Sequence, residues 1–137
     1  MADDQFNLEC DRLSRVVDPE AFENLEWART DGAALEAAAK RAMQALEHRE
    51  DLELVAEPSD DRRRRFVLRT KGSNPIDIAT LWMKVEGEMI ALWPEAIVDS
   101  KFKVSGAGRP FLTRVENADE AWLHSAIGQA MARVDHR

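Results

Sequence analysis

The spacing of apolar residues changes after Glu50, and this change limits the possible folds more than any other feature of the chain. Before it, apolar residues recur at the spacing of one helix face. After it, they alternate with polar residues, as they do along a β-strand. Strands grouped between helices favour an α+β fold over repeated β–α–β units. We predict an antiparallel β-sheet of about five to six strands, with N-terminal helices and a C-terminal helix packed mainly on one face.

Residues 18–49 are predicted to be helical. Asp18, Pro19 and Glu20 form a helix start, because they supply an N-cap acceptor, a first-turn proline and an acid at the positive end of the helix dipole. Residues 1–17 are less certain, since their apolar residues would suit a helix or a short strand, or a partly flexible segment. One buried helix face is indicated by Leu35, Ala38, Ala39, Ala42 and Leu46.

Residues 51–115 are predicted to form the sheet. Their longest apolar stretch, 76–94, is typical of a hairpin that turns at Glu86 and Gly87. A longer loop with a bulge is the alternative and would regroup the side chains. In either register both faces stay largely apolar, so helices on one side cannot cover everything. The two-residue turn places Leu81, Met83, Ile90 and Leu92 on one face, and Trp82, Lys84, Met89 and Trp93 on the other.

The glycines of SGAGRP, residues 105–110, have two interpretations. Glycines that cradle a phosphate normally lie between a strand and a helix N-terminus. Here a proline and an alternating segment follow them, so we favour a hairpin turn between strands 101–105 and 111–115. The final helix is predicted over 117–134, with a capping box from Asn117 to Glu120.

Charge is distributed unevenly along the chain, whose formal net charge is −7. Residues 1–61 carry 17 acidic and 6 basic side chains, residues 62–114 carry 5 and 11, and residues 115–137 carry 4 and 2. A basic block can bind anions, or it can pair with the acidic helices of the same chain. The candidate anion-binding residues are Arg63, Arg65 and Arg69, predicted to share one face of a strand, with Lys101, Lys103 and Arg109.

Several function classes lack support in the sequence. The chain of 137 residues contains no HExxH, CxxC or GxSxG motif, so we predict no catalytic residues, no metal and no cofactor, and we lean towards a non-enzymatic protein. No apolar run is long enough to cross a bilayer, and the N-terminus does not resemble a signal peptide. The single cysteine, Cys10, excludes an internal disulfide and favours the cytoplasm.

The length suits a single α+β domain over residues 1–137. We expect a small cytoplasmic interaction or regulatory module that uses Trp82, Met89 and Trp93 for self-association or for a protein partner, because tryptophan favours interfaces. The alternative is binding of nucleic acid or another polyanion by the basic face of residues 62–114. A pocket between helices and sheet, for a small ligand or an unrecognised enzyme activity, is a third class, because pockets are built by neighbours in space.

Overall fold

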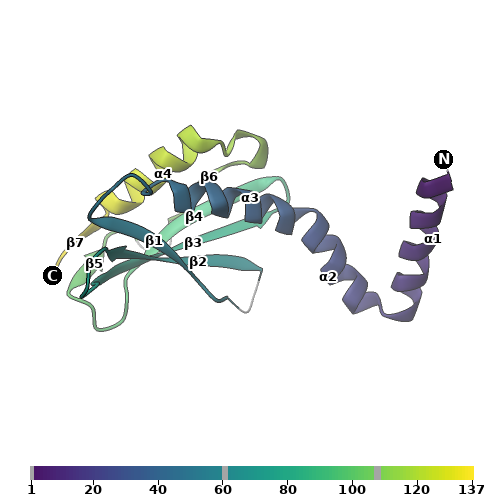
Figure 1. Cartoon of the computed structure of the whole chain (residues 1–137), viewed down its shortest axis with the longest axis horizontal. Helices are drawn as coiled ribbons and strands as arrows, with labels where there is room; N and C mark the ends of the chain where they lie inside the picture. The colour runs from purple at the N-terminus through teal and green to yellow at the C-terminus, as the bar shows by residue number, and fades with distance from the viewer. Residues whose placement is uncertain (1, 60–61, 107–108) are drawn as a thin grey trace. The chain divides into compact units, whose positions relative to one another are not determined.

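The computed structural model describes residues 2–59, 62–106 and 109–137. They form four α-helices, a five-stranded antiparallel sheet and a two-stranded sheet, which confirms the predicted α+β class (Figure 1). The chain divides into two compact units, residues 1–33 and 34–137. The single domain therefore stays a prediction, and each unit is described by itself.

The first unit is helical. Helix α1 (Ala2–Val17) answers the open question about the N-terminal segment, and α2 (Pro19–Arg29) begins where Asp18 accepts a hydrogen bond from the Ala21 amide at 3.1 Å, as predicted. An ion pair between Arg29 and Asp11, at 3.1 Å, joins the two helices. A second link places the Arg15 guanidinium 4.6 Å from the centre of the Phe22 ring.

Five strands of the second unit form the main sheet, in the spatial order β1-β2-β3-β4-β6. All neighbouring strands are antiparallel, as alternation and short turns favour. Strands β3 and β4 pair along most of their length and are the predicted hairpin. The strands are β1 (Leu52–Glu57), β2 (Arg63–Thr70), β3 (Asp77–Glu86), β4 (Met89–Glu95) and β6 (Phe111–Arg114).

One face of this sheet is covered by helices. Helix α3 (Asp31–Gln44), from Ala34 onward, and α4 (Glu120–Ala132) lie on the same side of the sheet (Figure 1). The alanines of α3 present little side-chain bulk, which allows close packing on the strands. Residues buried in this core include Leu35, Ala38 and Ala42 from α3, Leu81, Met83, Ile90 and Leu92 from the hairpin, and Leu123, Ile127 and Ala130 from α4.

Two predicted boundaries are wrong by a few residues. Glu86 pairs with Met89, so the hairpin turns at Gly87 and Glu88, one residue later than predicted. The turn follows the glycine, because Gly87 adopts a φ of 62°, a conformation that strains other residues. The predicted faces survive, because the shift moves the cross-strand pairing by two residues and alternation has a period of two.

The start of α4 also differs from the prediction. Asp119 is the N-cap, since its carboxylate accepts from the Trp122 amide at 2.9 Å. The predicted cap, Asn117, instead ends a short 3-10 helix, η1 (Val115–Asn117). The carboxylate two residues later competes successfully because it is charged and faces the positive end of the helix dipole.

The predicted hairpin across SGAGRP is wrong. Strand β5 (Phe102–Val104) pairs with β7 (Val134–His136), a C-terminal strand that begins at residue 134, where the predicted helix was expected to end. Arg133 secures this arrangement, because its guanidinium donates to the Gly106 carbonyl at 3.3 Å and to the Arg109 carbonyl at 2.7 Å. Gly106 does adopt the positive φ, 66°, that a turn requires. Residues 107 and 108 lie outside the described residues.

Candidate functional site

The second face of the five-stranded sheet is the candidate site. Among the described residues of the second unit, no helix lies over it (Figure 1). Trp82 of β3 is directly paired with Trp93 of β4. Met89 lies on the same side of the sheet, four residues before Trp93 in β4. The three predicted partner-binding residues therefore share one surface, on which both tryptophans are half-buried and Met89 is exposed. We call this surface the open face.

The two tryptophans form a rigid pair. Their ring centroids are 6.5 Å apart and their planes differ by 14°, which is an offset parallel arrangement. Glu95 fixes both rings, because it accepts from the Trp82 Nε1–H at 2.9 Å and from the Trp93 Nε1–H at 3.3 Å. One carboxylate thus satisfies both indole donors and holds the rings in a defined orientation. We call Trp82, Trp93 and Glu95 the tryptophan platform.

Arginines from β2 pack beside the platform. The guanidinium carbon of Arg63 lies 4.6 Å from the Trp82 ring centre, and that of Arg65 lies 5.9 Å from it. Both distances fall within the range of cation–π attraction, which favours arginine over an indole face. The strand pairing explains the contacts, since Arg65 is directly opposite Trp82 in the β2–β3 ladder. The central part of the open face therefore combines flat aromatic surface with positive charge.

Most other cations of the open face are already paired with carboxylates. Arg69 contacts Asp77 at 2.7 Å, and hydrogen bonding by that carboxylate raises the pKa of Arg69. Lys84 contacts Glu86 at 2.8 Å and, by its hydrogen bond, lowers the pKa of that carboxyl. The excess positive charge predicted for this face is therefore largely neutralised. Further ion pairs join Arg69 to Glu57, and Arg114 to Glu88 and Glu116.

Arg65 is different from these cations. Its Nε is buried and has no hydrogen-bond partner among the residues that the structure describes. Glu57 is opposite Arg65 in the β1–β2 ladder, but its carboxylate is directed to Arg69, at 3.8 Å. The adjacent Arg64 does not share the open face and instead contacts Glu36 of α3 at 3.2 Å. A buried polar atom without a partner is uncommon, so Arg65 is a feature that requires an explanation.

The six predicted anion-binding residues are not all in one place. Arg63, Arg65 and Arg69 occupy alternate positions of β2, as predicted from the sequence. Lys101 and Lys103 are exposed beside and within β5, which belongs to the two-stranded sheet. Lys103 is paired with Asp135 of β7 in that ladder. The remaining residue, Arg109, is exposed before β6.

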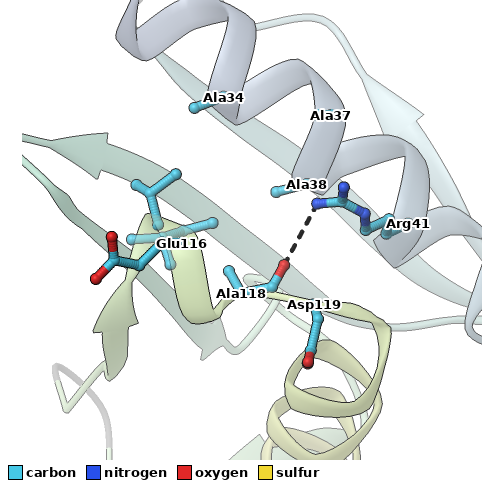
Figure 2. Close-up of a pocket in the computed structure, with 9 residues that line it drawn as sticks. Ala34, Ala37, Ala38, Arg41, Glu116, Ala118 and Asp119 are labelled. Atoms are coloured by element: carbon cyan, nitrogen blue, oxygen red, sulfur yellow. Dashed lines mark hydrogen bonds between the residues drawn. The ribbon is translucent and has the colours of Figure 1, made fainter.

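A pocket of about 370 Å³ opens between α3 and the start of α4 (Figure 2). Alanines of α3 form one wall, and the guanidinium of Arg41 donates to the Ala118 carbonyl at 3.4 Å across it. Glu116 and Asp119 contribute carboxylates to the lining. The lining contains no Ser, Cys or His side chain, and Arg41 links α3 to the segment before α4.

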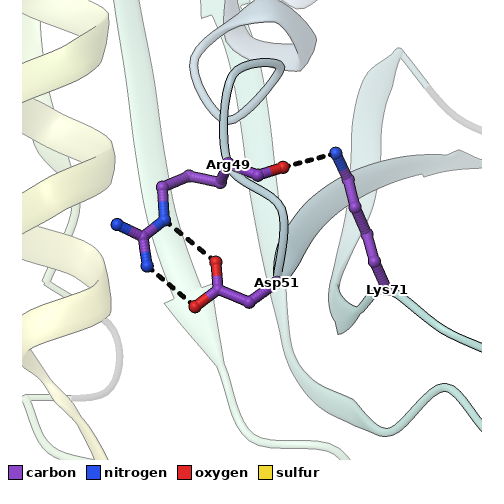
Figure 3. A network of polar contacts seen from close by, with 3 residues as sticks. All are labelled: Arg49, Asp51 and Lys71. Carbon is purple, nitrogen blue, oxygen red and sulfur yellow. Dashed lines mark hydrogen bonds and ion pairs between the residues drawn. The ribbon is translucent and has the colours of Figure 1, made fainter.

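A polar cluster at the start of β1 has a structural explanation (Figure 3). Arg49 donates to both carboxylate oxygens of Asp51, at 2.9 and 2.7 Å, and this hydrogen bonding lowers the pKa of Asp51. Lys71 donates to the Arg49 carbonyl at 2.6 Å, and the Lys71 amide donates to the Asp51 carbonyl at 2.9 Å. The cluster therefore ties the segment before β1 to the segment after β2.

Metal and membrane sites find no support in the part of the chain that the structure describes. Across residues 2–59, 62–106 and 109–137, no three His, Cys, Asp or Glu side chains are grouped to hold a metal ion. The helices described in these ranges are too short or too polar to cross a membrane. Cys10 is exposed on α1.

Sequence reasoning missed Glu95, although a signal was present. Glu95 follows Trp93 by two residues in the same strand, so the period of two already placed its side chain beside the indoles.

The site must be interpreted from these residues themselves. No family model, no curated protein and no solved structure shows significant similarity to this chain.

Proposed function

We propose that this protein is a cytoplasmic, non-enzymatic interaction module that binds another protein through the open face of its sheet. The carrying observation is the tryptophan platform, which is half-buried on a sheet face that no described helix of the second unit covers. Tryptophan contributes more binding energy at interfaces than most residues, especially at a central position surrounded by polar groups. The partner is a second copy of the chain or a different protein.

The order of the platform supports this proposal. Glu95 holds both indole rings before any partner arrives. Binding then requires less loss of side-chain freedom than it would with mobile tryptophans. The paired charges around the platform support it too, because a nearly neutral surface can approach another protein without a large desolvation penalty.

Binding of nucleic acid or another polyanion is the second candidate. The observation that favours it is the placement of Arg63 and Arg65 near Trp82, since single-stranded nucleic acids are bound by cations beside aromatic rings. We rank it lower for two reasons. Other cations of the face are engaged by carboxylates, and three of the predicted anion-binding residues are not on the strands that form it.

The test compares the wild-type protein with Trp93→Ala. Sedimentation velocity over a range of concentrations measures self-association, and affinity capture with both proteins as baits measures binding of other proteins. We expect Trp93→Ala to weaken association by about 30-fold or more, as for a central interface tryptophan. Met43→Ala, which removes an exposed apolar side chain from α3, is the control and should associate like the wild type.

Either of two results would contradict the proposal. One is a wild-type protein that stays monomeric and captures nothing that Trp93→Ala fails to capture. The other is tight binding of a single-stranded oligonucleotide whose affinity falls steeply with salt, because released counterions are the sign of phosphate contacts. That second result would instead support the polyanion candidate.

A further inference from the structure

We propose that Arg65 recognises a carboxylate on the bound protein, and that the partner is a segment with an acidic residue close to an apolar one. This inference rests on the proposed function and specifies the chemistry of the partner. Its starting point is Arg65 itself, a partly exposed side chain of β2 whose Nε is buried without a hydrogen-bond partner. Arg69, Lys84 and Arg114, on the same face, differ from Arg65 because each forms an ion pair with a carboxylate.

The contrast with those cations carries the argument. Arg69, Lys84 and Arg114 lie on the same face, and each contacts at least one carboxylate of the chain within 4 Å. Arg65 makes no ion pair with any described residue, and its contact is with the Trp82 ring, at 5.9 Å. Removing a guanidinium N–H from water without a partner is unfavourable. Although Nε itself is enclosed, Arg65 is partly exposed, and a ligand oxygen that paired with its guanidinium would supply the ion pair that it lacks within the described residues.

A carboxylate fits this position better than a phosphate does. The arginine fork can bind either group with two parallel hydrogen bonds. However, Glu57 is directly opposite Arg65 in the β1–β2 ladder, and Glu95 lies next to the platform. A doubly charged phosphate would be repelled by these neighbours more strongly than a singly charged carboxylate. Local charge therefore favours an acidic side chain over a phosphorylated residue.

The strand order sets the spacing within the partner. Trp82 is on the strand next to Arg65, and Trp93 is one strand further. Because neighbouring strands are about 4.8 Å apart, the carboxylate and the apolar group should be separated by roughly 5 to 10 Å. In an extended segment, residues i and i+2 have about this separation and point to the same side. The inferred motif is an acidic residue followed or preceded by an apolar residue at that spacing.

The experiment uses the full chain, labelled with ¹⁵N, and three probes. These are the capped tripeptide acetyl-Glu-Ser-Phe-amide, its isosteric partner acetyl-Gln-Ser-Phe-amide, and sodium acetate. Nuclear magnetic resonance reports the Nε–H signal of Arg65 and the indole N–H signals of Trp82 and Trp93. We expect saturable shifts with the glutamate peptide and about tenfold weaker binding of the glutamine peptide, as for loss of one charge-assisted interaction.

Variants separate recognition by Arg65 from general attraction. Arg65→Gln should bind both peptides equally weakly, and Arg65→Lys should restore only part of the difference, because lysine lacks the planar fork. Arg114→Gln is the matched control, since Arg114 shares the open face but already has two carboxylate partners. It should retain the preference for glutamate. Unchanged circular dichroism would confirm that each variant folds.

Each other outcome overturns the inference in a distinguishable way. Equal binding of the two peptides, with shifts at the tryptophans, would show a platform that does not recognise a carboxylate and would leave the proposed function in place. Equal shifts with acetate and with the glutamate peptide would identify a small-anion site. No response to any probe would contradict the acidic motif, while loss of association in Trp93→Ala would still support the proposed function.

Discussion

The two faces of the five-stranded sheet are built from alternate residues of the same strands, yet they differ in chemistry. The covered face consists of aliphatic side chains such as Ile90 and Leu92, which are fully buried beneath helices. The open face carries tryptophans and arginines that remain partly exposed. The comparison teaches that the helices account for only half of the apolar hairpin. The other half is satisfied in part by contacts among its own side chains and stays partly exposed.

The sharpest test of this contrast uses two neighbouring residues of β4. Ile90 is 0% exposed on the covered face, and Met89 is 40% exposed on the open face. Ile90→Ala should lower the free energy of unfolding by about 2–5 kcal/mol, because it leaves a cavity in the core. Met89→Ala should lower it by less than about 1 kcal/mol. Urea denaturation measures both, and similar losses would show that the two faces are equally important for stability.

The turn between β3 and β4 is expected to give the next largest effect on stability. Gly87 has a φ of 62°, and a Cβ added there would meet no atom within 4 Å. Gly87→Ala should therefore cost about 1–2 kcal/mol from backbone strain alone. Gly128 in α4 also has open space around it but a helical backbone, so Gly128→Ala should instead stabilise by about 1 kcal/mol. Thermal unfolding should show opposite signs, and matching signs would contradict this assignment.

A smaller effect is expected when the platform loses its acceptor. Glu95→Gln keeps the size of the side chain but replaces a charged acceptor with a neutral one, so unfolding should become easier by about 1 kcal/mol or less. The indole N–H signals of Trp82 and Trp93 should shift together, because Glu95 accepts from both. The signals of Trp27 and Trp122 serve as internal controls and should not move. A shift of only one of the paired indoles would mean that Glu95 does not bridge them.

The smallest effect concerns pH and the charge pairs of the open face. Lys84 lowers the pKa of Glu86, so this pair stabilises the fold fully above the ordinary glutamate pKa. The contribution is lost as the pH falls through the lowered pKa. The difference in stability between wild type and Glu86→Gln should therefore shrink towards zero in acid and be small throughout, since both side chains are substantially exposed. A difference that grows in acid would have the wrong sign.

Much of this architecture is predictable from local patterns. Alternation grouped Trp82 with Trp93 and Leu81 with Met83 correctly, because a hairpin of strongly apolar strands tolerates few registers. It failed at β5 and β7, which are three residues each and are paired across about 30 positions of sequence. Segments that short carry no period. Arg133, just before β7, also donates to the distant carbonyls of Gly106 and Arg109, and the sequence around either strand gives no sign of these contacts.

The candidate site shows the same division between local and spatial information. The tryptophans and the arginines of β2 were recognisable as candidates, but their contacts were not. Charge counts suggested a basic surface, whereas the distances place acids beside Arg69 and Lys84. Only the three-dimensional arrangement reveals that Arg65 has no such acid among the described residues, because a missing partner is a property of neighbours in space.

The double acceptance by Glu95 has a thermodynamic consequence. Both indole N–H groups of the platform are already occupied, so an incoming molecule meets ring faces and hydrocarbon edges and gains no hydrogen bond from them. Its association would be accompanied mainly by release of water from apolar surface. Titration calorimetry should then record a negative change in heat capacity, which would be retained when polar groups of the partner are exchanged and lost when its apolar anchor is removed.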